Sequence, residues 1–312
     1  MHMIVTGAAG FVGSTLVDRL LSEGHEVVGI DSFTDYYDPA VKRSNLAAAL
    51  SNDRFRLAEV DLVTTDLSDL FRDAAVVWHL AGQPGVRMSW SDGFDFYALR
   101  NITATQRVLE AAKTANVGRV VYASSSSVYG NAERFPTLET DRPEPFSPYG
   151  VTKLAGEHMC VLYTANWGVP TVSLRYFTVY GPRQRPDMAT HRLINAAFRQ
   201  ELFPMFGDGS QERSFTYVGD VVNATFLAGV TPDVEPGLVL NVAGAELCKL
   251  SHLIEMVGDA VGQPVPIDHR PAQAGDAAKT GGSTELIERT LGWKAETPLF
   301  EGIAAQVEHQ RP

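Results

Sequence analysis

The 312-residue chain has little cysteine, no excess of basic residues and no long apolar run, and each absence excludes a class of protein. Cys160 and Cys248 are too few for a disulfide scaffold, so we expect free thiols in a cytoplasmic protein. Lys and Arg number 26 against 37 Asp and Glu, which argues against a nucleic-acid-binding protein. No apolar run could span a bilayer, and an apolar strand beginning at Met3 leaves no room for a signal peptide, so we expect no membrane partner.

The composition that remains is that of an ordinary globular protein. Hydrophobic residues make up 45% of the chain and charged residues 20%. The length allows one large domain, or a domain with an appended lobe, around an ample core. None of the eight histidines pairs with cysteines or carboxylates at ligand spacing, so no metal site is expected.

A glycine-rich turn follows the first apolar segment. Residues 3–6 predict a short strand, and an amphipathic helix is expected to reach about Leu21. Between them stand Gly7, Gly10 and Gly13. Three glycines at a strand-to-helix turn let the backbone approach a pyrophosphate at the helix N-terminus. This spacing predicts a dinucleotide site.

A carboxylate supports the same prediction. Residues 26–30 predict a second strand, which ends in Asp31, roughly 20 residues beyond the glycines as a ribose-binding acid should be. Asp31 would bind the ribose 2′-hydroxyl and repel a 2′-phosphate, which favours NAD over NADP. The alternative is an aspartate that only caps a helix.

The chemistry centres on the stretch from Val120 to Lys153. Residues 120–123 predict a buried strand, and four serines follow at its carboxyl end, where open α/β sheets bind ligands. Pro148 suits a helix start, so Tyr149 and Lys153 fall at i and i+4 on one helix face. An ammonium near a phenol lowers its pKa, so Tyr149 is a candidate base. The alternative is a serine-rich turn with a solvated helix start.

Together the glycine spacing, the serine strand and the tyrosine–lysine pair resemble the extended short-chain dehydrogenase/reductases of the NAD-dependent epimerase/dehydratase family. The resemblance implies a Rossmann-type doubly wound parallel α/β sheet with a smaller mixed α/β substrate lobe. It implies a tightly bound NAD and a nucleotide-sugar substrate. Residues 1–178 would bind NAD, with about 217–242 returning to that domain. Residues 179–216 and 243–312 would form the nucleotide-sugar lobe.

The same resemblance implies a set of NAD contacts. They come from the glycine turn, the end of the second strand and the tyrosine–lysine pair. Others come from the end of a third strand expected at 54–60, the loop after a fourth at 75–78, and a sixth at 171–176. These residues are Gly7, Gly10, Phe11, Val12, Gly13, Asp31, Ser32, Asp61, Leu62, Leu80, Ala81, Gln83, Tyr149, Lys153 and Tyr176.

Three further blocks, residues 34–39, 85–89 and 183–189, are similar to those of the UDP-glucuronate 4-epimerases. This finer resemblance implies catalysis by Ser125, Tyr149 and Lys153. It also implies a substrate site, in which Ser126, Ser127, Thr178 and Arg185 are hypothesised to hold the sugar carboxylate. The substrate-binding residues are Arg87, Ser125, Ser126, Ser127, Tyr149, Thr178, Arg185, Met205, Phe206, Arg213, Arg270 and Asp276.

The reaction we expect is 4-epimerisation of UDP-glucuronate to UDP-galacturonate through a 4-keto sugar. A 4,6-dehydratase is disfavoured, because Ser126 and Ser127 stand where it needs an acid and a base. A UDP-glucuronate decarboxylase, a UDP-glucose/UDP-galactose 4-epimerase and a non-catalytic NAD-sensing module stay open. The family also implies a homodimer through long helices at 92–115 and 149–166, the alternative being burial of both helices on the chain's own sheet.

Overall fold

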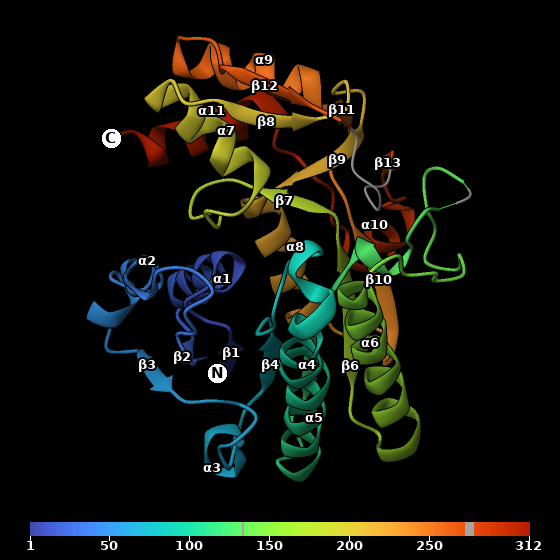
Figure 1. Cartoon of the computed structure of the whole chain (residues 1–312). Coiled ribbons are helices and arrows are strands. Elements are labelled where there is room, and N and C mark those ends of the chain that lie inside the picture. The colour runs from blue at the N-terminus through green and yellow to red at the C-terminus, as the bar shows by residue number, and fades with distance from the viewer. Residues whose placement is uncertain (133, 272–277) are drawn as a thin grey trace.

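One parallel sheet organises the chain, as the computed structural model shows for residues 1–132, 134–271 and 278–312 (Figure 1). Its strands lie in the order β10-β6-β5-β4-β1-β2-β3, and every neighbouring pair is parallel. The bounds are β1 His2–Thr6, β2 Glu26–Asp31, β3 Phe55–Glu59, β4 Val76–His79, β5 Arg119–Ser125, β6 Thr171–Tyr176 and β10 Leu238–Val242. The predicted Rossmann-type α/β fold is confirmed.

Helices cover both faces of this sheet, because parallel strands are apolar on both sides. One face packs against α1 (Phe11–Ser22), α8 (Val218–Val230) and α10 (Glu285–Leu291) in a shared apolar core. The other face packs against α3, α5 and α6 in a second core. The remaining helical bounds of this domain are α2 Pro39–Asn45, α3 Ser68–Phe71, α4 Phe94–Tyr97, α5 Ala104–Thr114 and α6 Pro148–Trp167. Among the described residues, no helix is long and apolar enough to cross a membrane.

A smaller lobe stands above the carboxyl ends of the sheet (Figure 1). Its strands form the order β11-β9-β13, with β7 also pairing β9, and a separate pair β12-β8. Among the lobe strands that the structure describes, β11 alone runs antiparallel to its neighbour, so the lobe is mixed. The bounds are β7 Thr178–Tyr180, α7 Ala189–Arg199, β8 Phe203–Phe206, β9 Glu212–Tyr217, β11 Leu247–Lys249, α9 Leu250–Val261, β12 Ile267–Arg270, β13 Lys279–Thr280 and α11 Leu299–Gln310.

Three features differ from the predicted elements. The amphipathic helices α7 and α9, which build the lobe core, were not predicted. The expected long helix at 92–115 begins as a 3₁₀ turn and contains a π segment at Ala98–Thr103. Helix α10, assigned to the lobe, packs on the main sheet through Ile287 and Leu291, so we propose a lobe without it.

The sheet order fixes where a ligand can bind. Strand order reverses between β1 and β4, so the crossovers after these strands leave on opposite sides. The gap at their carboxyl ends is the topological switch point at which doubly wound folds bind nucleotides. The glycine turn, β5 with its serines and the start of α6 all meet at this edge.

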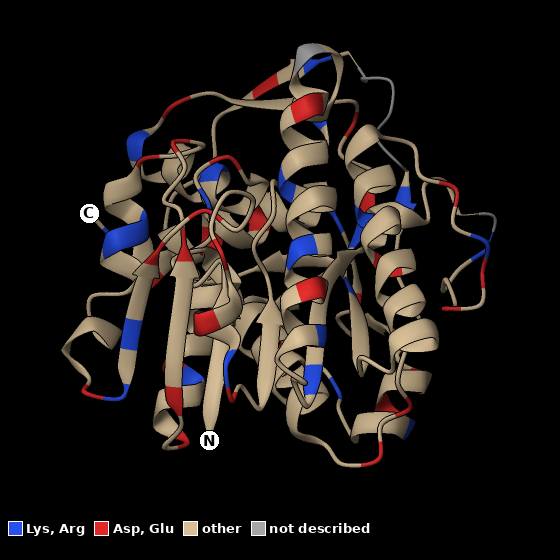
Figure 2. Ribbon diagram, turned by 90° about the horizontal axis from the view of Figure 1, so that it is seen from below, with Lys and Arg blue, Asp and Glu red and all other residues tan. Residues whose placement is uncertain are grey.

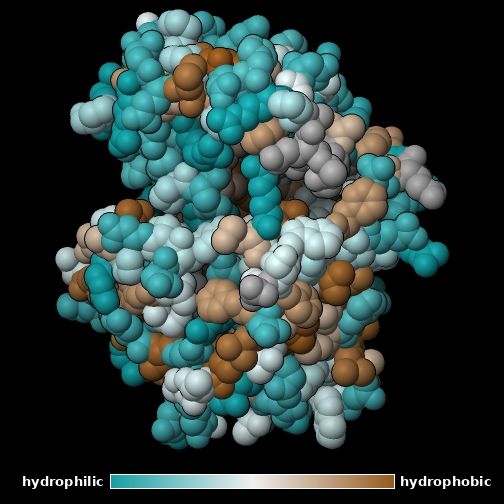
Figure 3. All heavy atoms as spheres, viewed as in Figure 1, coloured by the Kyte–Doolittle hydropathy of each residue, from teal (hydrophilic) through white to brown (hydrophobic). Residues whose placement is uncertain are grey.

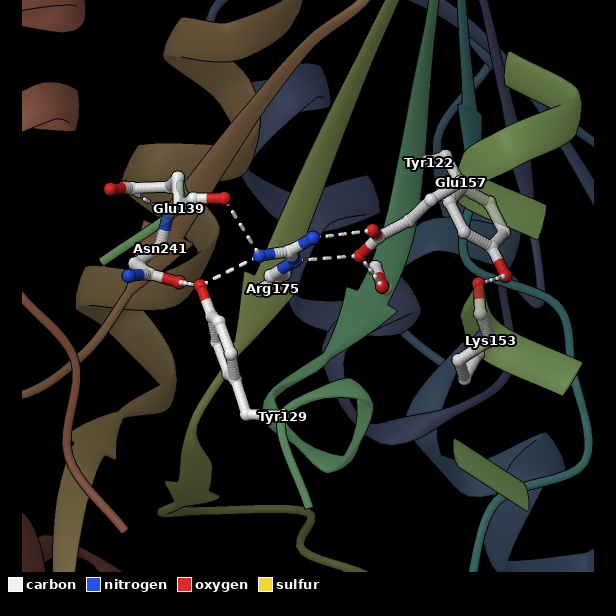
Figure 4. Close-up of polar contacts among 8 residues, drawn as sticks. Tyr122, Tyr129, Glu139, Lys153, Glu157, Arg175 and Asn241 are labelled. Carbon is white, nitrogen blue, oxygen red and sulfur yellow. Dashed lines mark hydrogen bonds and ion pairs between the residues drawn. The ribbon is translucent and has the colours of Figure 1, made fainter. Parts of the chain in front are cut away.

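A buried ion pair ties the elements of this edge together (Figure 4). Arg175 on β6 donates from Nε and Nη2 to the Glu157 carboxylate on α6, at 2.9 and 2.8 Å. Arg175 Nη1 donates to the Tyr129 hydroxyl at 2.8 Å, and that hydroxyl donates to Asn241 Oδ1 at 2.7 Å. Ser124 Oγ also donates to Glu157. The pair therefore links α6 to β5, β6 and β10.

An exposed pair offers a matched comparison. Figure 2 shows acidic and basic residues interleaved over the strands and helices. Arg43 binds both Glu59 oxygens, at 3.2 and 2.9 Å, in the same two-pronged manner as Arg175 and Glu157. The two pairs differ in burial. The Arg175 and Glu157 side chains are each 4% exposed, whereas the Arg43 and Glu59 side chains are each about half exposed.

We expect Glu157→Gln to lower the free energy of unfolding by about 3 kcal/mol, because removing one partner leaves a buried guanidinium without its counter-charge. Urea unfolding followed by circular dichroism measures it. Glu59→Gln, the control, should move the urea midpoint little, since water screens that pair. Equal shifts in the two variants would mean that the buried pair contributes no more than the exposed one.

Candidate active site

A cavity opens at the switch point, between the sheet and the lobe. Figure 3 shows the surface hollowed between the two parts of the molecule. Residues from the glycine turn, the strand ends, the start of α6 and the segment after β7 line it. The predicted site residues among them are Gly7, Gly10, Phe11, Val12, Gly13, Asp31, Ser32, Leu62, Leu80, Ala81, Gln83, Tyr149, Lys153, Tyr176 and Arg185.

The glycine turn is built by close backbone packing. Gly7 has φ +69°, and a Cβ placed there would lie 2.7 Å from the Ala81 nitrogen. A Cβ on Gly13 would lie 2.0 Å from the Gly7 oxygen. Only glycine fits both positions, and the resulting turn aims the amino end of α1 into the cavity. This cradle fits the pyrophosphate of a dinucleotide.

Asp31 is held at the cavity by two backbone donors. Its carboxylate accepts from the Ala9 nitrogen at 3.0 Å and from the Phe33 nitrogen at 2.8 Å. These bonds fix the carboxylate at the end of β2, beside the glycine turn. An anion held there suits a ribose hydroxyl and disfavours a ribose phosphate, as predicted.

Asp61 and Leu62, two of the expected NAD contacts, have different surroundings. Leu62 lines the cavity, whereas Asp61 forms an ion pair with Arg100 at 2.6 Å and accepts from the Val63 nitrogen at 2.8 Å. Burial raises the pKa of Asp61, but the bonds from Arg100 and Val63 outweigh it, so the pKa is lowered overall. Arg100 itself lines the cavity and was missed, because no motif marks a single helical arginine.

Tyr149 stands in the first turn of α6 with its phenol buried in the cavity wall. The helix begins where Ser147 Oγ accepts from the Gly150 nitrogen at 3.1 Å. Burial raises the pKa of Tyr149, against a hydrogen bond with Ser125 and the positive charge of Arg185. The pKa of the free protein therefore lies above the ordinary phenol value, contrary to the predicted low value.

Lys153 also differs in detail from the prediction. Its ammonium donates to the Ala123 carbonyl at 2.8 Å and lies 5.1 Å from the centre of the Tyr122 ring. Burial lowers the pKa of Lys153 to about 8, although the Glu157 carboxylate opposes this. Lys153 lines the cavity, where an added Cβ on Gly82 would meet its Nζ at 3.3 Å.

The four serines Ser124 to Ser127, which end β5 and begin the next turn, do not all face the cavity. Ser124 lines the cavity and bonds to Glu157, although it was not predicted as a site residue. Alternation along a strand could have distinguished Ser124 from Ser125. Ser125 Oγ accepts from the Ser127 nitrogen at 3.1 Å, and Ser126 begins the 3₁₀ turn Ser126–Val128.

Asn101, another missed residue, fixes the loop after β4. Its Oδ1 accepts from the Gln83 nitrogen at 2.6 Å, and its Nδ2 donates to the Gln83 carbonyl at 3.0 Å. Nδ2 also donates to Thr152 Oγ1 at 2.9 Å, on the helix that carries Tyr149. Asn101 lies in the π segment, and such segments often occur at functional sites.

Other predicted substrate residues in the described part of the chain are also absent from the cavity lining; they are Arg87, Met205, Phe206, Arg270, Thr178 and Arg213. The Arg87 guanidinium is 5.2 Å from the centre of the Phe206 ring, so it bridges the main domain and the lobe. Met205 is buried in the lobe core, which leaves only its backbone for a ligand. Strand register places Arg270 beside Phe206. The remaining residues are Thr178 on β7, Arg213 on β9 and Asp276, which lies outside the described residues.

Arg185, like Tyr149, is a predicted substrate residue that lines the cavity. Its Nε and Nη2 bind the Asp187 carboxylate at 3.0 and 3.1 Å. Burial lowers the pKa of Arg185, but Asp187 more than offsets it, and the guanidinium stays charged. Tyr36 and Tyr37, which were left out of the predicted site, line the same cavity.

Comparison with known proteins agrees with this geometry. Residues 3–243 match the NAD dependent epimerase/dehydratase family. The structure of UDP-glucuronic acid 4-epimerase from Bacillus cereus with UDP-glucuronic acid and NAD is similar, with TM-score 0.96, 40% identity and coverage of 99% and 98% of the two chains. A protein of Bacillus subtilis named an uncharacterized UDP-glucose epimerase, YtcB, is 40% identical over 98% of this chain and 97% of its own. A probable UDP-glucuronate 4-epimerase of Rhizobium meliloti is 35% identical over 99% and 96%.

The family match, the sheet topology and the cavity lining therefore all indicate the same kind of protein, over nearly the whole length of the chain. The predicted NAD cofactor is confirmed, since NAD is bound in similar solved structures. The relatives divide between glucuronate and glucose forms of the UDP-sugar. The chain belongs to the NAD-dependent epimerase/dehydratase family, as an extended short-chain dehydrogenase/reductase, and is an NAD-dependent UDP-sugar 4-epimerase.

Proposed function

We propose that the protein interconverts UDP-glucuronate and UDP-galacturonate. The observation that carries this proposal is Arg185, a charged guanidinium in the cavity wall close enough to Tyr149 to act on its pKa. A cation there suits a sugar that carries a carboxylate next to its reacting carbon. The Bacillus cereus enzyme, whose structure holds UDP-glucuronic acid, is 40% identical.

In this proposal Tyr149 takes the proton of the 4-hydroxyl, and Ser125 bonds the same oxygen. NAD bound in this cavity would supply the acceptor, and later the donor, of the C4 hydride, and its positive charge would favour the Tyr149 phenolate. Lys153 orients the nicotinamide ribose from its place beneath the Ala123 carbonyl. The 4-keto sugar turns over in the pocket, so that the hydride would return to its other face while Tyr149 gives the proton back to the C4 oxygen.

The carboxylate must be restrained while the ketone exists. A 4-keto uronate is a β-keto acid, and it loses carbon dioxide when the bond to the carboxyl carbon stands perpendicular to the ketone plane. We propose that Ser126, Ser127, Thr178 and Arg185 hold that bond away from perpendicular. Asp187 accepts from Nε and Nη2 of Arg185. The N–H groups at the end of the guanidinium point in a different direction, and in this proposal they face the sugar.

The same Asp187 contact favours a second candidate, a UDP-glucose/UDP-galactose 4-epimerase. A buried guanidinium without a counter-ion is costly, so an arginine that served only a substrate carboxylate would disfavour neutral sugars. Asp187 already balances Arg185. A neutral sugar would then leave no unpaired charge in the pocket.

A homodimer through α4 to α6 belongs to the same proposal. Apolar side chains on this face are exposed, among them Phe96, Leu99, Val151, Val161 and Leu162 (Figure 3). Their burial against a second copy would supply the apolar centre that stable interfaces have.

Tyr149→Phe should lower turnover of UDP-glucuronate by about 10²-fold or more, because the ring remains while the proton acceptor is lost. Bound NAD, measured after acid release, should stay at the wild-type level. Tyr163→Phe removes a hydroxyl from the same helix, where it donates to Glu110, and is the matched control. Near-normal turnover of Tyr149→Phe at saturating substrate would end the assignment.

Arg185→Ala, or Ser126 and Ser127 both changed to Ala, should weaken UDP-glucuronate binding about tenfold or more, since charge-assisted bonds are lost. Both variants should raise the ratio of UDP-4-keto-pentose to UDP-galacturonate, measured by mass spectrometry. UDP-glucose should be a very poor substrate of the wild type.

Arg199→Ala, at the end of α7, is the control for loss of an arginine. If the cradle variants match wild type in affinity and product ratio, and UDP-glucose turns over as well as UDP-glucuronate, the neutral-sugar epimerase becomes the better assignment.

Leu162→Glu should convert the dimer to a monomer, because a charge on the apolar face cannot be buried without a partner. Light scattering after gel filtration gives the mass. Leu202→Glu, the control, changes another exposed leucine, which lies outside these helices, and this variant should stay dimeric. A wild-type monomer at micromolar concentration would refute the interface.

A further inference from the structure

Residues 181–188, which we call the strap, connect β7 to α7 and cross from the lobe toward α1 and α2 (Figure 1). The strap is firmly rooted in the lobe. The Gly181 nitrogen donates to Gln306 Oε1 on α11 at 2.9 Å. Gln184 donates to the Val179 carbonyl at 3.0 Å and accepts from the His191 nitrogen at 2.9 Å. The strap therefore moves with the lobe.

Its outer edge is tied to the main domain at two points. Arg183 Nη2 lies 2.7 Å from Asp18 Oδ2 on α1, the helix whose amino end faces the cavity. The Tyr36 hydroxyl donates to Asp187 Oδ2 at 3.2 Å. Tyr36 lies five residues after Asp31, in the segment that connects β2 to α2. Both anchors thus belong to the elements that form the dinucleotide cradle.

The second anchor runs along the cavity rim. Tyr36 and Arg185 both line the cavity, and Asp187 binds both of them. A Cβ added to Gly85 would lie 2.9 Å from the Tyr36 hydroxyl oxygen, so the loop after β4 also reaches this point. Tyr36, Asp187 and Arg185 form a continuous chain of polar contacts from one wall to the other.

These contacts at the cavity rim give a structural reason why the three blocks of the finer resemblance are found in one protein. Residues 34–39, 85–89 and 183–189 marked the finer resemblance, yet most of their side chains have no part in the proton and hydride transfers. In space the three blocks converge at Tyr36, Gly85 and Asp187. Their common position is the edge of the cofactor cavity, not its reacting centre.

We propose that the strap retains the cofactor: the Arg183–Asp18 and Tyr36–Asp187 contacts must both break before NAD can enter or leave. Asp18 and Asp187 do not line the cavity among the described residues, so they act on NAD through the strap. Asp18 and Asp187 are therefore positioning residues, which hold the strap in the place where it retains NAD. The inference rests on the NAD site and not on which UDP-sugar is used.

The first anchor, the Arg183–Asp18 ion pair, should weaken as the salt concentration rises. The Arg183 side chain is 23% exposed and that of Asp18 36% exposed, so dissolved ions reach this pair. Raising the ionic strength shortens the Debye length from about 10 Å at 0.1 M to about 3 Å at 1 M. Salt should therefore speed cofactor exchange in the wild type and have less effect once Asp18 is neutral.

The test follows the cofactor itself, without turnover. Protein loaded with NADH is mixed with excess NAD, and the loss of nicotinamide fluorescence gives the release rate. Protein freed of cofactor by dialysis gives the binding rate. Tyr36→Phe and Asp18→Asn should each raise both rates roughly fivefold, and together roughly twentyfold, because each removes one modest contact.

Matched controls leave the strap contacts in place. Glu23→Gln breaks the Arg19–Glu23 ion pair on the same helix as Asp18. Asp35→Asn changes the exposed neighbour of Tyr36. Both should exchange NADH at wild-type rates. Asp18→Arg combined with Arg183→Asp restores the ion pair with reversed charges, and it should return both rates to the wild-type range.

Two results would overturn the proposal. Unchanged release from Tyr36→Phe and Asp18→Asn would show that the strap does not limit exchange. Faster release with an unchanged binding rate would show that these residues hold NAD only as direct contacts, since a barrier slows passage in both directions. Failure of the charge reversal to restore the rates would remove the Asp18 anchor from the proposal.

Discussion

The close approach of backbone atoms at the first turn is the constraint on which the site depends. Gly7 and Gly13 leave no room for a side chain, and the turn packs directly on the loop that follows β4. Because this contact sets the position of α1 relative to β4, it also sets the width of the switch point. Asp31 accepts a bond from Ala9 in the same turn, so the ribose end is aligned by the same contact.

The buried charged groups in and beside the cavity lie near partners of opposite charge. Lys153 has the Glu157 carboxylate one helical turn away, Glu157 is shared with Arg175, and Arg185 is paired with Asp187. Burial lowers the pKa of Lys153 and raises that of Tyr149, so it disfavours the charged form of both groups. These fixed partners compensate the buried charges before any ligand binds, which lowers the cost of placing a cationic cofactor ring in the site.

The sequence predicted the parallel sheet well, because its strands are apolar runs bounded by glycine or acidic residues. The turn at Gly7 and the pair Tyr149 and Lys153 were predictable from spacing along single elements. Asn101 and Ser124 were missed, because their roles come from contacts with residues distant in the sequence, Gln83 and Glu157. The low pKa expected for Tyr149 was wrong for the free protein, since burial cannot be read from a motif.

An epimerase uses one hydride twice, and this makes cofactor retention a chemical requirement. The hydride removed from C4 must return to the same sugar, so exchange of the cofactor between the two transfers would strand a ketone. A dehydrogenase has no such need, because its reduced cofactor is a product. The anchors at Asp18 and Tyr36 lie on the NAD-binding domain, while the strap belongs to the substrate lobe. A contact that joins these two parts ties cofactor release to separation of the lobe from the sheet, which is the motion least compatible with a ketone still in the pocket.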